Sequence, residues 1–193
     1  ENNTFLHFAI EHFNDDREEM IQTLIDAGAN INAKNNKEYS PIHVGALLLE
    51  NNKRKKALQL LIRNGFNVNA GEYQGLPLLH FIMLYSEEIT VELIQMLLDN
   101  GANINMRDKN GFTILHVTFV TFSGFELTQF LIDNGSNINV QSKDGTTPLH
   151  IMAKYSRREN YKKKLELLLK QNCQLNLINE KGESALHLVC KNI

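Results

Sequence analysis

The chain has 193 residues, of which 42% are hydrophobic and 22% charged, and its formal net charge is −2. This composition is typical of a globular protein, and no stretch approaches the roughly 20 apolar residues of a membrane-spanning helix. The small net charge gives no overall attraction to nucleic acid or acidic membranes, so neither is an expected partner. Two cysteines are too few for a disulfide framework. We therefore expect a reducing compartment, which is the cytoplasm or, as the alternative, the nucleus. The sequence does not determine the oligomeric state, and we favour a monomer.

Six of the seven histidines recur at nearly constant intervals of 36, 37, 36, 34 and 37 residues. Self-similarity at such a period predicts a stack of repeated units rather than one irregular domain. Each histidine ends a similar four-residue phrase, and the phrase is most regular as Thr-Pro-Leu-His at 147–150. The six residues are His7, His43, His80, His116, His150 and His187.

Each predicted unit runs from a hairpin into two helices. Asp108 to Gly111 have the residue types that favour a tight turn, and Thr113 is a suitable N-cap for the helix that follows. Pro77 takes the cap position of another unit, where a missing N–H costs little. A second apolar run with helical spacing then ends 15 residues before the next histidine. We predict a left-handed helix stop at each of these ends, which are Gly28, Gly65, Gly101, Gly135 and Asn172.

The repeated phrase resembles the signature of the ankyrin repeat, and the resemblance covers all 193 residues. It implies an all-α solenoid of stacked helix-turn-helix units joined by β-hairpin loops, in one domain over residues 1–193. Because both ends fall within a repeat, we expect the chain to be a piece of a longer protein. The approximate repeats are 1–35, 36–72, 73–108, 109–142, 143–179 and, incomplete, 180–193.

Six regularly spaced histidines invite a metal or catalytic interpretation, but repeat geometry argues against it. Equivalent positions in stacked helices lie roughly 8–10 Å apart, whereas zinc ligands lie about 2 Å from the metal. The resemblance implies instead that each imidazole bonds to the hairpin backbone. His187 and Cys190 are one helical turn apart, but no third orienting group is near them in sequence. We expect no catalytic residue, no metal and no cofactor, and therefore no enzyme in this segment.

Ankyrin repeats usually bind other proteins through a concave side, made of hairpin tips and the exposed end of each first helix. At the corresponding positions, the second to fourth repeats carry mainly Leu, Tyr, Phe and Val. Exposed apolar groups on a rigid surface favour a protein interface, although bulky neighbours could bury some of them. The predicted partner-binding residues are Tyr39, Leu47, Leu48, Tyr73, Leu76, Leu84, Tyr85, Phe112, Val120 and Tyr155.

Two basic runs are predicted to lie in the turns between paired helices. One is 53–56, and the other contains Lys154, Arg157, Arg158 and 162–164. Three interpretations of these basic runs stay open: a solvated loop, a nuclear-localisation signal and a contact with an acidic partner.

The predicted function is recognition of another protein, without a small-molecule substrate. Three alternatives stay open. The segment could be the substrate-targeting arm of an enzyme or effector whose catalytic domain lies elsewhere, or a structural spacer or anchor. It could also use its basic runs to contact acidic membranes or nucleic acid.

Overall fold

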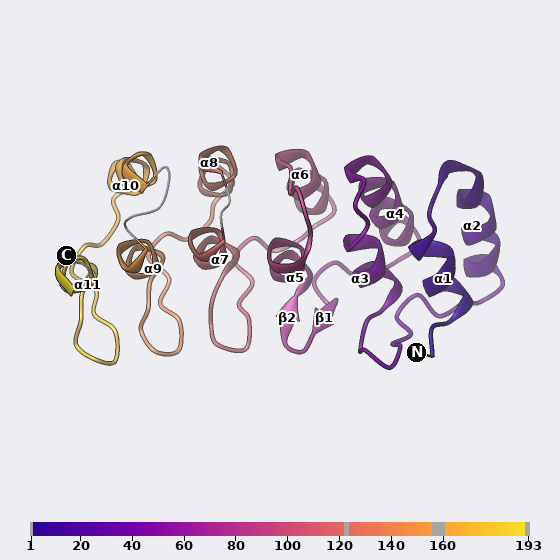
Figure 1. The fold of residues 1–193 in the computed structure, drawn as a ribbon, viewed down its shortest axis with the longest axis horizontal. Helices are drawn as coiled ribbons and strands as arrows, with labels where there is room; N and C mark the ends of the chain where they lie inside the picture. The colour runs from indigo at the N-terminus through magenta and orange to yellow at the C-terminus, as the bar shows by residue number, and fades with distance from the viewer. Residues whose placement is uncertain (1, 122–123, 156–160, 192–193) are drawn as a thin grey trace. The chain divides into compact units, whose positions relative to one another are not determined.

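The structure is a computed structural model that describes residues 2–121, 124–155 and 161–191. These residues form helix pairs joined by hairpins, and they fall into two compact units, Glu1–Asn103 and Ile104–Ile193. Each unit is described by itself (Figure 1). The all-α repeat fold predicted from the sequence is confirmed. The single domain over residues 1–193 stays a prediction.

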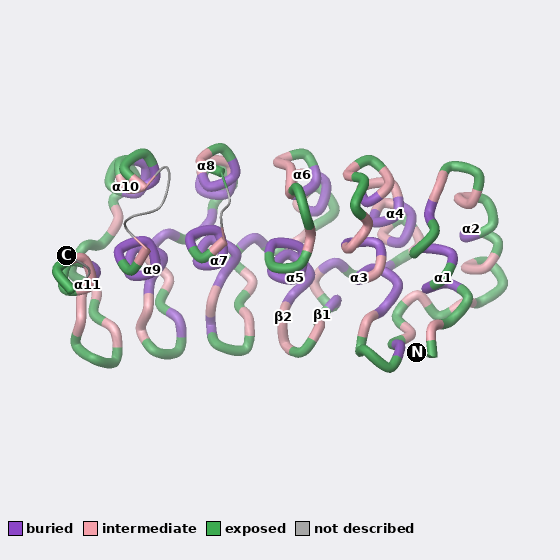
Figure 2. The backbone as a smooth tube through the Cα atoms, viewed as in Figure 1, coloured by how far each residue is buried: buried purple, intermediate pink, exposed green. Residues whose placement is uncertain are grey.

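The first unit contains three pairs of helices. The inner helices, which follow the hairpins, are α1 (Phe5–Glu11), α3 (Pro41–Ala46) and α5 (Leu78–Tyr85). The outer helices are α2 (Glu18–Asp26), α4 (Asn51–Arg63) and α6 (Val91–Asp99), and a short 3-10 helix, Asp15–Arg17, precedes α2. Buried segments lie on the inner helices and on the sides of the outer helices that face them (Figure 2).

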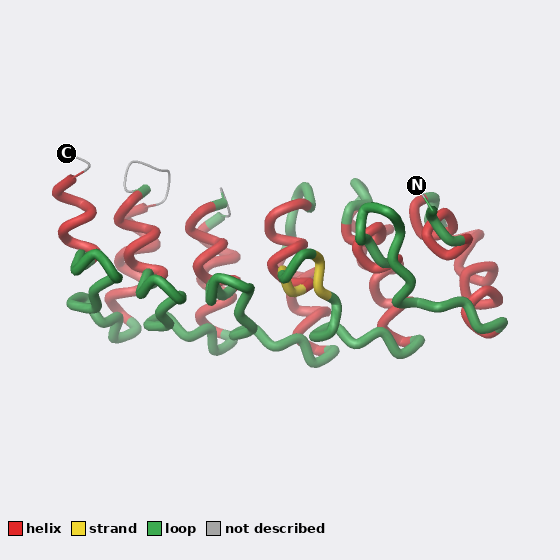
Figure 3. The backbone as a smooth tube through the Cα atoms, turned by 90° about the horizontal axis from the view of Figure 1, so that it is seen from below, coloured by secondary structure: helices red, strands yellow, loops and turns green. Residues whose placement is uncertain are grey.

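The second unit repeats the same arrangement. Its inner helices are α7 (Ile114–Val120), α9 (Pro148–Lys154) and α11 (Ala185–Lys191). Its outer helices are α8 (Phe125–Asp133) and α10 (Tyr161–Lys170). In each unit, the hairpin loops of consecutive repeats follow one another on the same side of the helices (Figure 3).

The repeated phrase works as an unusual capping box. Thr113 precedes α7, and its backbone N–H donates to Nδ1 of His116, which occupies the position where Glu or Gln usually closes such a box. Ser40 and His43 make the same contact before α3. The sequence starts α1, α3, α7, α9 and α11 with two residues that satisfy each other's polar groups, whereas α5 begins after Pro77, which has neither a backbone N–H nor a hydroxyl.

Each complete helix pair ends at a residue with positive φ. The value is 91° at Gly65, and it is 57° at Asn172, where asparagine replaces glycine. Glycine adopts this conformation without a Cβ clash, and asparagine tolerates it better than most residues.

The first basic run lies inside α4, which corrects its predicted position in a turn. The helix begins at Asn51, two residues before the run. Arg54 is fully buried, and its Nε donates to the carbonyl of Leu48 at 2.8 Å. Its Nη1 donates to the carbonyl of Glu88 at 3.3 Å. Since these carbonyls belong to the turns before α4 and α6, one buried guanidinium joins the turns of two successive repeats.

The second basic run is also largely helical. Lys154 is the last residue of α9, and residues 162–164 belong to the first turn of α10. Lys164 is buried, with its Nζ 5.7 Å from the ring centre of Phe119. Arg157 and Arg158 lie outside the described residues.

Candidate functional site

Histidine side chains connect hairpins of successive repeats in both units. Nε2 of His7 lies 2.8 Å from the carbonyl oxygen of Tyr39, and Nε2 of His150 lies 2.9 Å from that of Glu183. Nδ1 of each ring accepts a backbone N–H bond from its own helix cap. The proton therefore sits on Nε2, which donates to the carbonyl. In these rings both nitrogens are committed to the backbone, which suits a structural role.

His43 is the exception, because its Nε2 is buried without a hydrogen-bond partner in the described part of the chain. The hairpin that follows it has a different shape: β1 (Glu72–Tyr73) pairs with β2 (Leu76–Pro77) around a two-residue turn. Both turn residues, Gln74 and Gly75, have positive φ. Burial, helped by the charge of Lys34, lowers the pKa of His43 to about 4.

The predicted partner-binding residues of the first unit include a tyrosine patch, which we define as Tyr39, Tyr73 and Tyr85. The ring centres of Tyr39 and Tyr73 lie 4.7 Å apart, and that of Tyr85 lies 5.0 Å from the buried Phe81. Tyr85 is 49% exposed, whereas Tyr39 and Tyr73 are half-buried. Burial, together with a hydrogen bond to Tyr73, raises the pKa of Tyr39. The tyrosine patch is thus a packed aromatic surface in which Tyr85 is the most exposed ring.

The leucines predicted with this patch differ in exposure. Leu84 is 42% exposed at the end of α5. Leu47, Leu48 and Leu76 are half-buried. Neighbouring side chains therefore cover part of the predicted apolar surface.

The second unit has a groove of about 480 Å³ between its hairpins and its inner helices. The three predicted residues of this unit all line it, and Val120 is 41% exposed. We call this cavity the inner groove. Its apolar lining consists of Phe112, Val120, Ile151, Tyr155 and Leu188.

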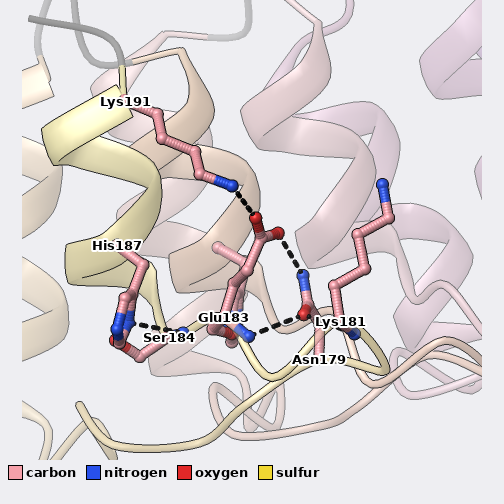
Figure 4. Close-up of polar contacts among 7 residues, drawn as sticks. Asn179, Lys181, Glu183, Ser184, His187 and Lys191 are labelled. Atoms are coloured by element: carbon pink, nitrogen blue, oxygen red, sulfur yellow. Dashed lines mark hydrogen bonds and ion pairs between the residues drawn. The ribbon is translucent and has the colours of Figure 1, made fainter.

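The charged part of the inner groove includes an internal ion pair. Glu183 accepts hydrogen bonds from Nζ of Lys191 and, at 3.2 Å, from Nδ2 of Asn179 (Figure 4). The bond from Lys191 contributes most to lowering the pKa of this carboxyl, followed by Asn179. Lys181 lies on the same hairpin but donates none of these bonds. The Glu183 carboxylate is therefore already occupied by donors of its own chain.

Asp144, from the preceding hairpin, is satisfied in a similar way. Its Oδ1 accepts the hydroxyl of Ser142 at 2.6 Å and the backbone N–H of Thr146 at 3.1 Å. The Ser142 bond is the largest cause of the lowered pKa of Asp144.

Some lining residues of the inner groove were not among the predicted partner-binding residues. Ile151 and Leu188 each follow a repeat histidine directly, and Lys191 lies four residues after one. The repeat register could have found Lys191, since Val120 also lies four residues after a histidine. The prediction missed Lys191 because it selected apolar residues, and it missed Ile151 and Leu188 because it considered only the hairpins and the exposed ends of the inner helices.

Asparagines form a second connection between repeats. Asn69 donates from Nδ2 to the carbonyl of Gly101 at 2.8 Å, and its Oδ1 accepts the N–H of Asn103 at 2.8 Å. Asn105 makes the equivalent bonds to Gly135 and Asn137. These side chains satisfy the backbone after α6 and α8, where carbonyls lack helical partners.

Other kinds of site find no support in the described ranges. No three His, Cys, Asp or Glu side chains there are grouped so that they could hold a metal ion. Among the same residues, no helix is both long and apolar enough to cross a membrane.

The helix pairs, hairpins and histidine contacts define the class of α-helical repeat proteins. Three family models match the chain: "Ankyrin repeats (3 copies)" over residues 118–192, "Ankyrin repeats (many copies)" over 91–117 and "Ankyrin repeat" over 1–36. The chain belongs to the ankyrin-repeat family, which confirms the resemblance seen in the sequence. No curated protein matches it significantly. Ankyrin repeats are generally protein interaction modules, and their domains are typically non-catalytic.

Proposed function

We propose that this chain recognises another protein through its hairpin surface, meaning the hairpins and the exposed ends of the inner helices. One observation carries the proposal: large apolar side chains stay exposed at the same repeat position. Leu84 is 42% exposed and Val120 is 41% exposed, and each lies four residues after a repeat histidine. Because the position repeats, the exposed apolar groups fall on the corresponding surface of each unit.

Two features of the hairpin surface favour binding of a partner: an aromatic side chain of restricted mobility and a groove of suitable volume. The ring of Tyr85 packs against Phe81, so the Tyr85 side chain loses little conformational freedom when a partner covers its exposed edge. Aromatic side chains dominate the energetics of many protein interfaces. The inner groove has the volume of a typical ligand-binding cleft.

We also propose that the chain is a monomer in the cytoplasm or nucleus. A targeting arm for a catalytic domain elsewhere would use the same hairpin surface, so it is compatible with the proposal. A spacer or anchor would leave the surface without a partner, and its substitution would have no effect on binding.

Replacing both Tyr85 and Phe112 by Ala should weaken capture of the protein partner from extracts of the source cells by at least about tenfold. Buried aromatic anchors typically contribute about 2 kcal/mol or more each. The measurement is quantitative pull-down with the purified chain, with circular dichroism melts to verify folding.

Leu169→Ala is the matched control, because Leu169 is 46% exposed on the outer helix α10. It should leave capture unchanged. Equal loss in the control, or undiminished capture by the folded double variant, would count against the hairpin surface.

A further inference from the structure

We propose that the tyrosine patch of the first unit binds an arginine side chain of the protein partner. The guanidinium would lie against the exposed ring of Tyr85, and the carboxylate of Glu72 would attract it. This inference rests on the proposed function and specifies the chemistry of the segment that the hairpin surface recognises.

The first argument is the unequal charge of the two units. Residues 1–103 contain 14 Asp and Glu against 8 Lys and Arg, which gives a formal charge of −6. Residues 104–193 contain 8 Asp and Glu against 12 Lys and Arg, which gives a formal charge of +4. Because a net charge attracts groups of the opposite sign, the first unit favours a cationic segment and the second does not.

The second argument is the arrangement of the aromatic rings. The ring centre of Phe81 lies 5.0 Å from that of Tyr85 with the planes tilted by 39°, and that of Tyr73 lies 6.2 Å from it with the planes at 90°. These two rings hold the Tyr85 side chain in place, yet Tyr85 is 49% exposed. The face of an aromatic ring attracts cations, and arginine, whose guanidinium is planar, stacks on such rings more often than lysine does.

The third argument is that the histidine packed against the patch is uncharged at neutral pH. The ring centre of the buried His43 lies 6.3 Å from that of Tyr39 and 6.0 Å from that of Tyr73. Burial, helped by the charge of Lys34, lowers its pKa to about 4, so His43 does not repel a cation bound at the patch. Lys34 is itself paired with Glu38 at 3.3 Å.

The fourth argument is an available carboxylate. Glu72 directly precedes Tyr73 on β1, is exposed, and makes no side-chain hydrogen bond or ion pair with the residues that the structure describes. Glu87 and Glu88 are less available, because both act on the buried Arg54. Neighbouring strand residues point to opposite faces, so Glu72 attracts the cation through space rather than by contact. Consecutive Cα atoms lie about 3.8 Å apart, well within the Debye length of about 8 Å at physiological salt.

The test is selection from a random dodecapeptide library displayed on phage, with the immobilised chain as bait. Enriched peptides should contain Arg. A synthetic peptide of an enriched sequence should lose about five- to thirtyfold in affinity when citrulline, which keeps the planar shape without the charge, replaces its Arg. Fluorescence anisotropy measures the affinity, which should also fall with added salt.

Variants of the chain assign the contact to the tyrosine patch. Tyr85→Leu removes the ring but keeps an apolar side chain, so it should lose about as much affinity as the citrulline peptide, and Tyr85→Phe should recover most of that loss. Glu72→Lys should weaken binding at least about threefold. Glu19→Lys makes the same charge change on an exposed residue of the outer helix α2, and it should bind nearly normally.

Several results would overturn the inference and leave recognition by the hairpin surface standing. They are a library without enriched peptides, enriched peptides without Arg, citrulline peptides that bind as tightly as the originals, and a folded Tyr85→Leu variant with full affinity. Equal weakening in Glu72→Lys and Glu19→Lys would likewise reject an attraction at the patch. Enriched peptides that bind the folded double variant Tyr85→Ala, Phe112→Ala as tightly as the original chain would contradict both proposals.

Discussion

Arg54→Ala should lower the free energy of unfolding by about 3–5 kcal/mol, the range expected when a large buried side chain is removed and buried carbonyls lose their donor. The guanidinium is fully buried and donates to the carbonyls of Leu48 and Glu88 and to the side chain of Asn51. Removing it leaves two turn carbonyls without this donor and opens a cavity beneath them. Urea unfolding followed by circular dichroism measures the change.

Lys53→Ala is the neighbouring control. Lys53 precedes Arg54 in α4 but pairs with Glu50 at the surface, so its removal should cost less than about 1 kcal/mol. Arg54→Met should retain part of the packing and lie between the two. If Arg54→Ala were as stable as Lys53→Ala, the guanidinium would not hold the two turns together.

Stability should also fall by about 3 kcal/mol, through His43 alone, as the pH falls from 6.5 to about 4. The pKa of His43 is about 4 in the folded chain, against 6.5 for an unperturbed histidine. Between these two pH values the His43 side chain binds a proton in the unfolded chain but not in the folded chain. Its contribution to stability is therefore fully present above pH 6.5 and is lost on acidification. One unit of pKa difference corresponds to about 1.4 kcal/mol.

The measurement compares urea unfolding at pH 7.0 and about pH 4.5 for the unaltered chain and for His43→Gln. Carboxylates also titrate toward the acidic end, but they contribute to both proteins and cancel in the difference. The unaltered chain should lose about 2–3 kcal/mol more than the variant. Parallel losses would show that burial beside Phe81 and the lack of an Nε2 partner do not keep His43 neutral.

The repeat register could be predicted because it depends on local chemistry. A cap hydroxyl, a histidine three residues later and a left-handed helix stop are all visible in a short stretch of sequence, as at Thr147 and His150. Their period then predicts the helix pairs, which the structure has.

The environment of Arg54 could not be predicted, because its partners lie far apart in the chain. Four consecutive cations at 53–56 look like a solvated turn. The carbonyl of Glu88 is 34 residues from Arg54 and becomes its neighbour only when repeats stack. The unpaired Nε2 of His43 could not be predicted for the same reason, because its surroundings include the altered hairpin of the next repeat at 72–77.

The candidate site was predicted in part. Phe112, Val120 and Tyr155 were chosen as apolar residues at interface positions, and all three line one groove. Whether they bind a partner stays a prediction. The donors that occupy Glu183 and Asp144 could not be read from the sequence, because hydrogen-bond geometry decides which charges remain available.

Photo-crosslinking from two matched positions of the second unit tests the central claim most directly. Benzoylphenylalanine would replace either Val120 on the hairpin surface, 41% exposed, or Leu169 on the outer helix α10, 46% exposed. Illumination in the source cells should give discrete adducts with a protein partner from position 120 and none from position 169. Adducts from position 169 alone, or equal adducts from both, would contradict recognition through the hairpin surface.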